Sequence, residues 1–360
     1  MLNMNAQSKS PVRGDLLSCY TTSIAEYMQQ AGIDYQLVMG SQLFLAVNVQ
    51  IENPARLSFV HYHTPLLGNF TTHSLHLIRK GTADLAETIR SIAIQCEMFG
   101  AVIVVGDAIN FPWSVTYGKK HTPHWFIITA IDEQHAYVTD RFEFLNEHGM
   151  QQPFTGRINR EQLATILQAH LVQEHIYQAR ERWAFGLKTP TSDQELQPYQ
   201  WFESTIRPKS QATDEQSIWL LLKKTCAFHS GQQRRTDLSK AGWTCGLQAL
   251  HSLAHHFESH LDNAAIYQYS DDIWVAARNR QMFVHTLDRI GKTLQMADLN
   301  VLVAWCEAEL IEQWNAIPRI MRYNAGCLER GRKPSMLLVE SLHTAARLEE
   351  ILLERLHHIS

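Results

Sequence analysis

The spacing of hydrophobic residues differs between the two halves of the chain. In residues 1–185, apolar positions at helical spacing alternate with short β-branched runs that are typical of strands. After about residue 215, almost every apolar stretch repeats at helical spacing. The pattern therefore predicts a part that mixes helices and strands, followed by a part that is mainly α-helical.

The first half contains a predicted helix that begins beside a cysteine. Residues 18–31 have helical spacing, Ser18 can cap the N-terminus, and Gly32 ends the helix. The turn at Glu133 and Gln134 joins two runs into a hairpin. The other predicted elements are helices over residues 83–98 and 158–169 and strands over residues 101–107, 124–132 and 135–140.

A change of composition separates the two parts. Residues 189–214 carry Pro190, Pro198 and Pro208 among polar residues, which is typical of a linker, although Trp201 and Phe202 indicate that part of this stretch packs down. We therefore expect domains over residues 1–188 and 215–360, with the linker between them. The helices predicted in the second domain cover residues 216–225, 247–260, 273–290, 299–314 and 336–357.

Composition narrows the class of protein. The chain has 360 residues, of which 45% are hydrophobic and 19% charged, so it can build a packed core. A formal charge of −4 argues against nucleic acid as a partner. No secretory signal or membrane-spanning run is visible, which predicts a cytoplasmic protein without a membrane partner. The six cysteines contain no C-x-x-C pair and the histidines are scattered, so no metal site is expected.

Cys19 is the strongest candidate for a nucleophile. It lies at the start of the predicted helix, where unpaired N–H groups and the helix dipole favour a thiolate. His124 opens a strand, and Asp140 closes the next strand of the same hairpin, so the two side chains should lie together. This order of cysteine, histidine and aspartate is typical of papain-like cysteine enzymes and predicts a catalytic set of Cys19, His124 and Asp140.

Four more polar residues are expected near this set. Asp107 ends a strand, and Asn110, Tyr117 and His121 lie in the loop that leads to His124. His121 is the main rival for the catalytic base, but it lies in a loop rather than at a strand edge. We interpret all four as substrate-binding residues, with a plain surface histidine as the alternative for His121.

Two other clusters have a weaker claim to function. His61 and His63 could bind a metal from one strand face, although two histidines without a third ligand favour a surface or pocket role. Cys245, in the segment GWTCGLQAL, resembles a cysteine-protease nucleophile more closely than Cys19 does. The histidines after it all lie in helical segments, so Cys245 is expected to pack inside the helical domain unless it uses His124 in a permuted site.

The residues around the candidate site resemble a known family. The N-terminal half looks like the papain-like domain of the butirosin-biosynthesis acyltransferase family, and the helical half resembles the domain attached to it. In the N-terminal half, the resemblance is carried by the segments SCYTTSIAEYMQQAGID, VVGDAINFPW, YGKKHTPHWFIITAID and AYVTD. In the helical half, the best local match is the segment RNRQMFVHTLDRIG. The family pattern D…P…Y…H..H falls here on Asp107, Pro112, Tyr117, His121 and His124.

The resemblance implies an α+β fold, with a papain-like cysteine-enzyme domain followed by the helical domain, and acyl transfer as the reaction. An acyl group would pass from phosphopantetheine on an acyl or peptidyl carrier protein to Cys19, and then to a small-molecule amine. No bound cofactor is expected, since the donor arrives activated. One departure is that Arg13 stands where papain-like enzymes place an oxyanion-binding glutamine; the nearest glutamine is Gln7. Asn110 or a backbone amide could substitute.

Two other functions are compatible with the sequence. A cysteine hydrolase, either a peptidase or a thioesterase, would use the same residues but would admit water instead of an amine. A non-catalytic protein would use the helical domain to bind a partner. An acyl adduct on Cys19 would separate both enzymes from the third possibility.

Overall fold

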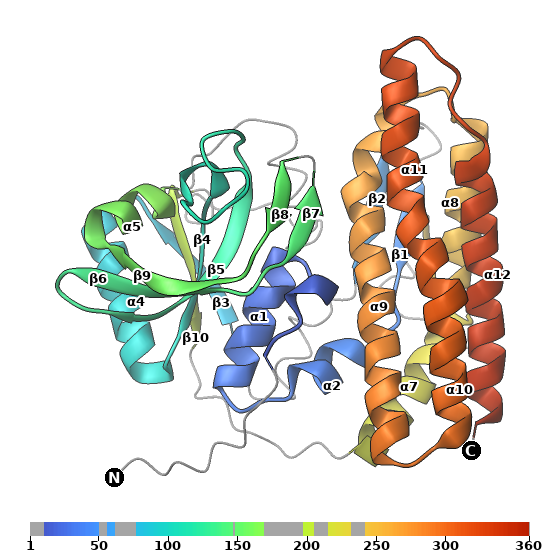
Figure 1. The fold of residues 1–360 in the computed structure, drawn as a ribbon, viewed down its shortest axis with the longest axis horizontal. Coiled ribbons are helices and arrows are strands. Elements are labelled where there is room, and N and C mark those ends of the chain that lie inside the picture. Colours follow the sequence, from blue (N-terminus) through green and yellow to red (C-terminus); the bar gives the residue numbers. More distant parts are fainter. Residues whose placement is uncertain are drawn as a thin grey trace. The chain divides into compact units, whose positions relative to one another are not determined.

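The computed structural model describes residues 11–49, 56–61, 77–146, 148–168, 197–204, 215–231 and 242–359 (Figure 1). The protein is mixed α and β and divides into two compact units. The first, called the α/β unit below, comprises Met1–Ile33, Ser74–Tyr177 and Ser192–Ser210. The second, called the helical unit, comprises Asp34–His73, Gln178–Thr191 and Gln211–Ser360.

Over the described residues, this division differs from the predicted domains in two places. Residues 34–73 belong to the helical unit, because apolar side chains in the described part of this stretch, among them Leu45 and Val47, pack into the helical core. The predicted linker is wrong at Tyr199–Ser204, which forms a strand, β10, inside the sheet of the α/β unit. Trp201 and Phe202 are both buried there, which explains why hydrophobic residues occur in a proline-rich stretch.

A six-stranded antiparallel sheet forms the centre of the α/β unit, with the strand order β3-β10-β4-β5-β6-β9. The buried central strand β4 confirms the strand predicted from its β-branched run. The strands of this sheet are β3 (Leu77–Thr82), β4 (Val102–Asp107), β5 (Pro123–Ile131), β6 (His135–Asp140), β9 (Phe154–Asn159) and β10. A separate hairpin joins β7 (Phe144–Asn146) to β8 (Gly149–Gln151).

Helices cover both faces of this sheet (Figure 1). Helix α1 (Cys19–Gln30) packs on one face, where the ring of Tyr20 contacts that of Trp125 on β5. Helices α4 (Leu85–Phe99) and α5 (Arg160–Leu167) pack on the other face, around a buried cluster that includes Phe126. Side chains alternate along a strand, so neighbouring residues of β5 serve the two different cores.

The helical unit gathers long amphipathic helices around one apolar core. Its helices are α2 (Tyr35–Gly40), α7 (Glu215–His229), α8 (Leu247–Ser259), α9 (Ser270–Thr293), α10 (Ala297–Trp305), α11 (Glu312–Glu329) and α12 (Leu337–His358), with a π-helical turn over Cys306–Ile311. The helices predicted after residue 215 are confirmed, except that the helix predicted over residues 299–314 continues through the π-helical turn into α11 and ends only at Glu329. A three-stranded sheet was not predicted; it comprises β1 (Ala46–Val49), β2 (Leu57–Val60) and β11 (Trp243–Cys245).

A buried charged cluster lies within the helical core. The carboxylate of Glu349 accepts hydrogen bonds from Arg280 Nε at 2.7 Å and Trp314 Nε1 at 2.8 Å, and pairs with His229 Nε2 at 2.5 Å. Arg280 also donates to the carbonyl of Phe44, which fixes the segment before β1 to the helices. Over the part of the chain that is described, no helix is long and apolar enough to span a bilayer.

Candidate functional site

Cys19 is the first residue of α1, and a strong N-cap fixes its position. The Ser18 side chain accepts a hydrogen bond from the backbone N–H of Thr21, while the Thr21 hydroxyl accepts one from the backbone N–H of Ser18. This capping box defines where the helix begins. At that position the backbone N–H of Cys19 has no acceptor within the helix, so it can bind an oxyanion. The thiol itself is 7% exposed.

The β5–β6 hairpin brings His124 and Asp140 together. Ile127 pairs with Thr139 across the two strands, so the register places Phe126 opposite Asp140, with His124 as its diagonal neighbour on the same face. His124 Nε2 lies 2.8 Å from Asp140 Oδ2. The predicted contact between this histidine and this aspartate is therefore confirmed.

Two further groups hold Asp140 in place. Trp113 Nε1 donates to Oδ2 at 2.9 Å, and the backbone N–H of Phe142 donates to Oδ1 at 3.1 Å. The rings of Phe111 and Phe142 lie 5.3 and 5.6 Å from the His124 imidazole, which shields the pair from water. The sequence analysis did not single out Trp113 or Phe142. Their only signal was position: an aromatic residue in the loop before His124 and another just after Asp140.

Charge distribution favours a protonated His124. Burial lowers its pKa, but the Asp140 carboxylate, the charge of Cys19 and side-chain hydrogen bonds to both outweigh burial and raise the pKa of His124 to about 10. Because Nε2 is bound to Asp140, Nδ1 is the ring nitrogen that remains for the Cys19 side chain. A cationic imidazole beside a thiol favours the thiolate, which is the nucleophilic form.

Two glycines permit the close approaches that build this site. A Cβ on Gly14 would lie 1.7 Å from the carbonyl oxygen of Arg141, so the turn before α1 packs directly against the chain that leaves β6. A Cβ on Gly106 would lie 2.8 Å from the ring of Phe111. Gly106 pairs with His124 across β4 and β5, so its missing side chain makes room for the ring that packs on the imidazole.

A second histidine–carboxylate pair lies at the same end of β4 and β5. Asp107 is fully buried, and its Oδ2 lies 2.5 Å from His121 Nδ1. The backbone N–H of Thr122 donates to Asp107 Oδ1 at 2.9 Å. His121 is 37% exposed, so its ring reaches solvent while Asp107 fixes its orientation.

The other two predicted substrate-binding residues lie in the loop between β4 and β5. Asn110 Nδ2 donates to the carbonyl of Thr165 at 3.3 Å, so Asn110 joins the loop to α5. Tyr117 is 54% exposed, in the loop that leads to His121. Arg13 forms an ion pair with Asp15 at 2.6 Å. Gln7 lies outside the described residues.

The remaining candidates are His61, His63 and Cys245. His61 Nε2 lies 2.9 Å from Asp272 Oδ1 and its ring stacks on Phe59, while His63 lies outside the described residues. Among the residues that the structure describes, no group of three or more histidine, cysteine, aspartate or glutamate side chains could hold a metal ion. Cys245 is half-buried at the end of β11 in the helical unit, the part of the protein in which it was expected to pack.

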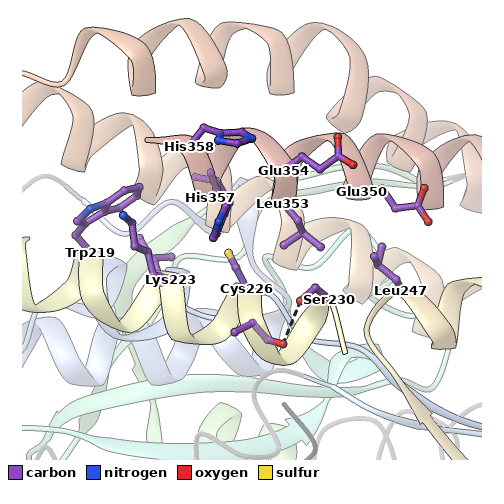
Figure 2. A pocket seen from close by; sticks show the side chains of 13 residues that line it. Trp219, Lys223, Cys226, Ser230, Leu247, Glu350, Leu353, Glu354, His357 and His358 are labelled. Carbon is purple, nitrogen blue, oxygen red and sulfur yellow. Dashed lines mark hydrogen bonds between the residues drawn. The ribbon is translucent and has the colours of Figure 1, made fainter. Parts of the chain in front are cut away.

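The helical unit contains a separate cavity of about 530 Å³ between α7, the start of α8 and the end of α12 (Figure 2). Apolar side chains such as Trp219 and Leu353 line it, together with Cys226. Burial raises the pKa of the Cys226 thiol to about 12, so this cysteine is a poor nucleophile. Lys223 Nζ donates to the carbonyl of Ile359 at 2.8 Å and thereby fixes the end of α12.

Comparison with known proteins adds no further constraint on the site. No protein-family model matches the chain. No curated protein matches it at a significant level either. The features that bear on function are therefore the geometry of Cys19, His124 and Asp140 and the chemistry around them.

Proposed function

We propose that the protein is a cysteine-dependent acyltransferase whose nucleophile is Cys19. The observation that carries this proposal is the imidazole of His124, which is bound to Asp140 on one side and interacts with Cys19 on the other. All three residues belong to the α/β unit. Their order along the chain, and a helix start facing a β-hairpin, support a papain-like arrangement for this unit.

Acylation follows from the charges in this site. The Cys19 thiolate attacks the carbonyl carbon of a thioester, and the backbone N–H of Cys19 binds the oxyanion that forms. Collapse breaks the bond from carbon to the donor sulfur, and His124 gives its proton to that leaving thiolate. The products are an acyl-Cys19 thioester, a free donor thiol and a neutral His124 that Asp140 keeps in position.

The donor and acceptor classes come from the resemblance to the butirosin-biosynthesis acyltransferases. By that analogy, the donor is an acyl or peptidyl carrier protein loaded through phosphopantetheine, the acceptor is an amine of a small metabolite, and the setting is natural-product biosynthesis. The six cysteines of the structure are all free thiols, which suits a cytoplasmic enzyme. Thioester exchange is nearly neutral in energy, and amide formation then runs downhill.

Hydrolysis of the acyl-enzyme is the alternative outcome of the same geometry. The polar pair of His121 and Asp107 at the same strand ends favours transfer, because a buried carboxylate that orients an exposed imidazole can handle the protons of an ammonium acceptor. A purely binding function would leave the contacts among Cys19, His124 and Asp140 without a role.

The test is the fate of a thioester probe. Butanoyl-N-acetylcysteamine is added to the full chain, and the intact mass is followed before and after addition of ethanolamine. We expect a butanoyl adduct on Cys19 that ethanolamine removes as its amide, and no adduct in Cys19→Ala. Cys245→Ala is the matched control and should acylate normally. An adduct lost only to water would instead indicate a hydrolase, and an adduct that survives Cys19→Ala would contradict the proposal.

A further inference from the structure

Amide formation from an ammonium ion involves two proton transfers. At neutral pH an aliphatic amine arrives as an ammonium ion, and it must lose two protons to become an amide. After acylation, His124 is neutral and can accept one of them, which restores the resting pair of thiolate and imidazolium. The other proton goes either to solvent before the amine binds or to a second base near the acyl group, and a second base would speed the reaction at neutral pH.

The structure contains a second oriented imidazole at this end of the sheet. Asp107 is fully buried and binds three groups: His121 Nδ1 at 2.5 Å and the backbone N–H groups of Thr122 and Ile109 at 2.9 and 3.3 Å. The carboxylate is therefore fixed from the backbone as well as from the ring. Asp107 binds His121 at Nδ1, and the side chain is 37% exposed, so a substrate can reach the ring from solvent.

The strand register places this pair beside the base of the nucleophile. Asp107 lies opposite Pro123, and Gly106, the residue before it, lies opposite His124, so the two histidine–carboxylate pairs occupy neighbouring positions at one end of the β4–β5 ladder. Helix α1, which begins with Cys19, packs on the same two strands. The backbone hydrogen bond from Ala108 to Thr122, at 2.8 Å, extends the β4–β5 ladder to the residue next to His121.

We propose that His121, oriented by Asp107, is the second base of this site and takes the first proton from an ammonium acceptor. The free amine then attacks the acyl-Cys19 carbonyl carbon. The new bond joins nitrogen to carbon, the carbon–sulfur bond breaks, and the electron pair leaves on the Cys19 sulfur. The second proton passes from nitrogen to His124, and His121 releases its own proton to solvent. This inference rests on the acyltransferase function proposed above.

Two acceptors separate the roles of the two histidines. Ethanolamine is an ammonium ion at neutral pH and must lose two protons, whereas hydroxylamine is mainly neutral and must lose only one. The full chain is first acylated with butanoyl-N-acetylcysteamine, and loss of the butanoyl mass from Cys19 is timed with each acceptor. In His121→Gln we expect the reaction with ethanolamine to slow by about 100-fold, the usual scale of general-base catalysis, and the reaction with hydroxylamine by less than about threefold.

Raising the pH gives a readout that a merely structural role would not produce. More ethanolamine is then present as the free base, so the deficit of His121→Gln should shrink as pH rises. Asp107→Asn removes the carboxylate that orients the ring and should show the same acceptor-dependent deficit.

Each other outcome contradicts the inference. Equal slowing with both acceptors, slowing with neither, or a wild-type acyl-enzyme that reacts with hydroxylamine but not with ethanolamine would show that His121 is not this base. A wild-type protein that forms no adduct on Cys19 would instead contradict the acyltransferase itself.

Discussion

Each unit of the protein contains a buried histidine bound to a carboxylate, but the two histidines differ in their third partner. In the α/β unit, His124 lies between Asp140 and the Cys19 thiol. In the helical unit, His229 is bound to Glu349, whose other partners are Arg280 and Trp314.

The third partner decides what each cluster can do. Burial raises the pKa of Glu349, but Arg280 and His229 outweigh burial and lower it to about 2, so this carboxylate stays ionised inside the core and its charge is fully compensated. Such a cluster ties helices together and offers no reactive group. In the other cluster, the positive charge on His124 is shared with a thiol that can become a nucleophile. A histidine–carboxylate pair therefore indicates nucleophilic catalysis only when a nucleophile completes it.

The largest expected effect comes from the histidine beside the nucleophile. His124→Ala should slow acylation of Cys19 by about 10⁴-fold, because the thiolate loses its counter-ion and the leaving thiol its proton donor. The fold should survive, since Asp140 keeps the donors Trp113 and Phe142. Adduct formation measures the rate and circular dichroism checks the fold. A full rate in His124→Ala would move the role of base to His121.

The corresponding change in the helical unit should affect stability. Arg280→Met leaves the buried Glu349 carboxylate without its main counter-charge, which costs about 3 to 5 kcal/mol of unfolding free energy. Urea denaturation measures the loss. The double variant Arg280→Met with Glu349→Leu is the matched control, because it removes both charges and should recover part of that stability. A single variant as stable as the wild type would contradict a tightly coupled pair.

A smaller effect is expected from the tryptophan that holds Asp140. Trp113→Phe keeps the ring that stacks on Phe154 but removes the donor to Asp140 Oδ2. One charge-assisted hydrogen bond contributes about 1.5 kcal/mol, so the acylation rate should fall by about tenfold. Trp219→Phe, in the helical unit, is the control and should leave the rate unchanged. Equal effects of the two changes would argue against positioning through Asp140.

A further expected effect is a dependence of stability on pH. The pKa of His124 is raised in the folded protein from 6.5 to about 10, so the folded state binds more protons than the unfolded state between these values. The contribution of His124 to the free energy of unfolding is therefore complete below pH 6.5 and is lost as pH rises toward about 10. His124→Gln should remove this part of the decline. Parallel stability curves for the two proteins over that interval would contradict the ion pair.

Much of the candidate site could be predicted because its geometry is local. Once His124 opens one strand and Asp140 closes the next, the hairpin alone brings their side chains together. The short turn brings His124 and Asp140 together, so predicting their contact requires no information about the core. The helix start at Cys19 was equally local, since Ser18 provides its own cap.

The parts that were not predicted depend on contacts between distant residues. Strand β1 pairs with β11 about two hundred positions later. Each of these runs is too short for its alternation of side chains to indicate a strand by itself. The strand β10 is flanked by prolines and polar residues, and only its pairing with β3 and β4 makes it part of a sheet. Trp113 reaches Asp140 across a loop, and no spacing in the sequence predicts that contact.

The most direct test of the central claim is the relative reactivity of the six cysteines at neutral pH. Burial raises the pKa of the Cys96, Cys226 and Cys306 thiols to about 12. Cys327 is buried, so the half-buried Cys245 is the main comparison for Cys19. A brief pulse of iodoacetamide, followed by peptide mass spectrometry, should label Cys19 at least about tenfold faster than Cys245, and His124→Ala should abolish that preference. Faster labelling of Cys245, or a Cys19 rate that is the same without His124, would contradict the account.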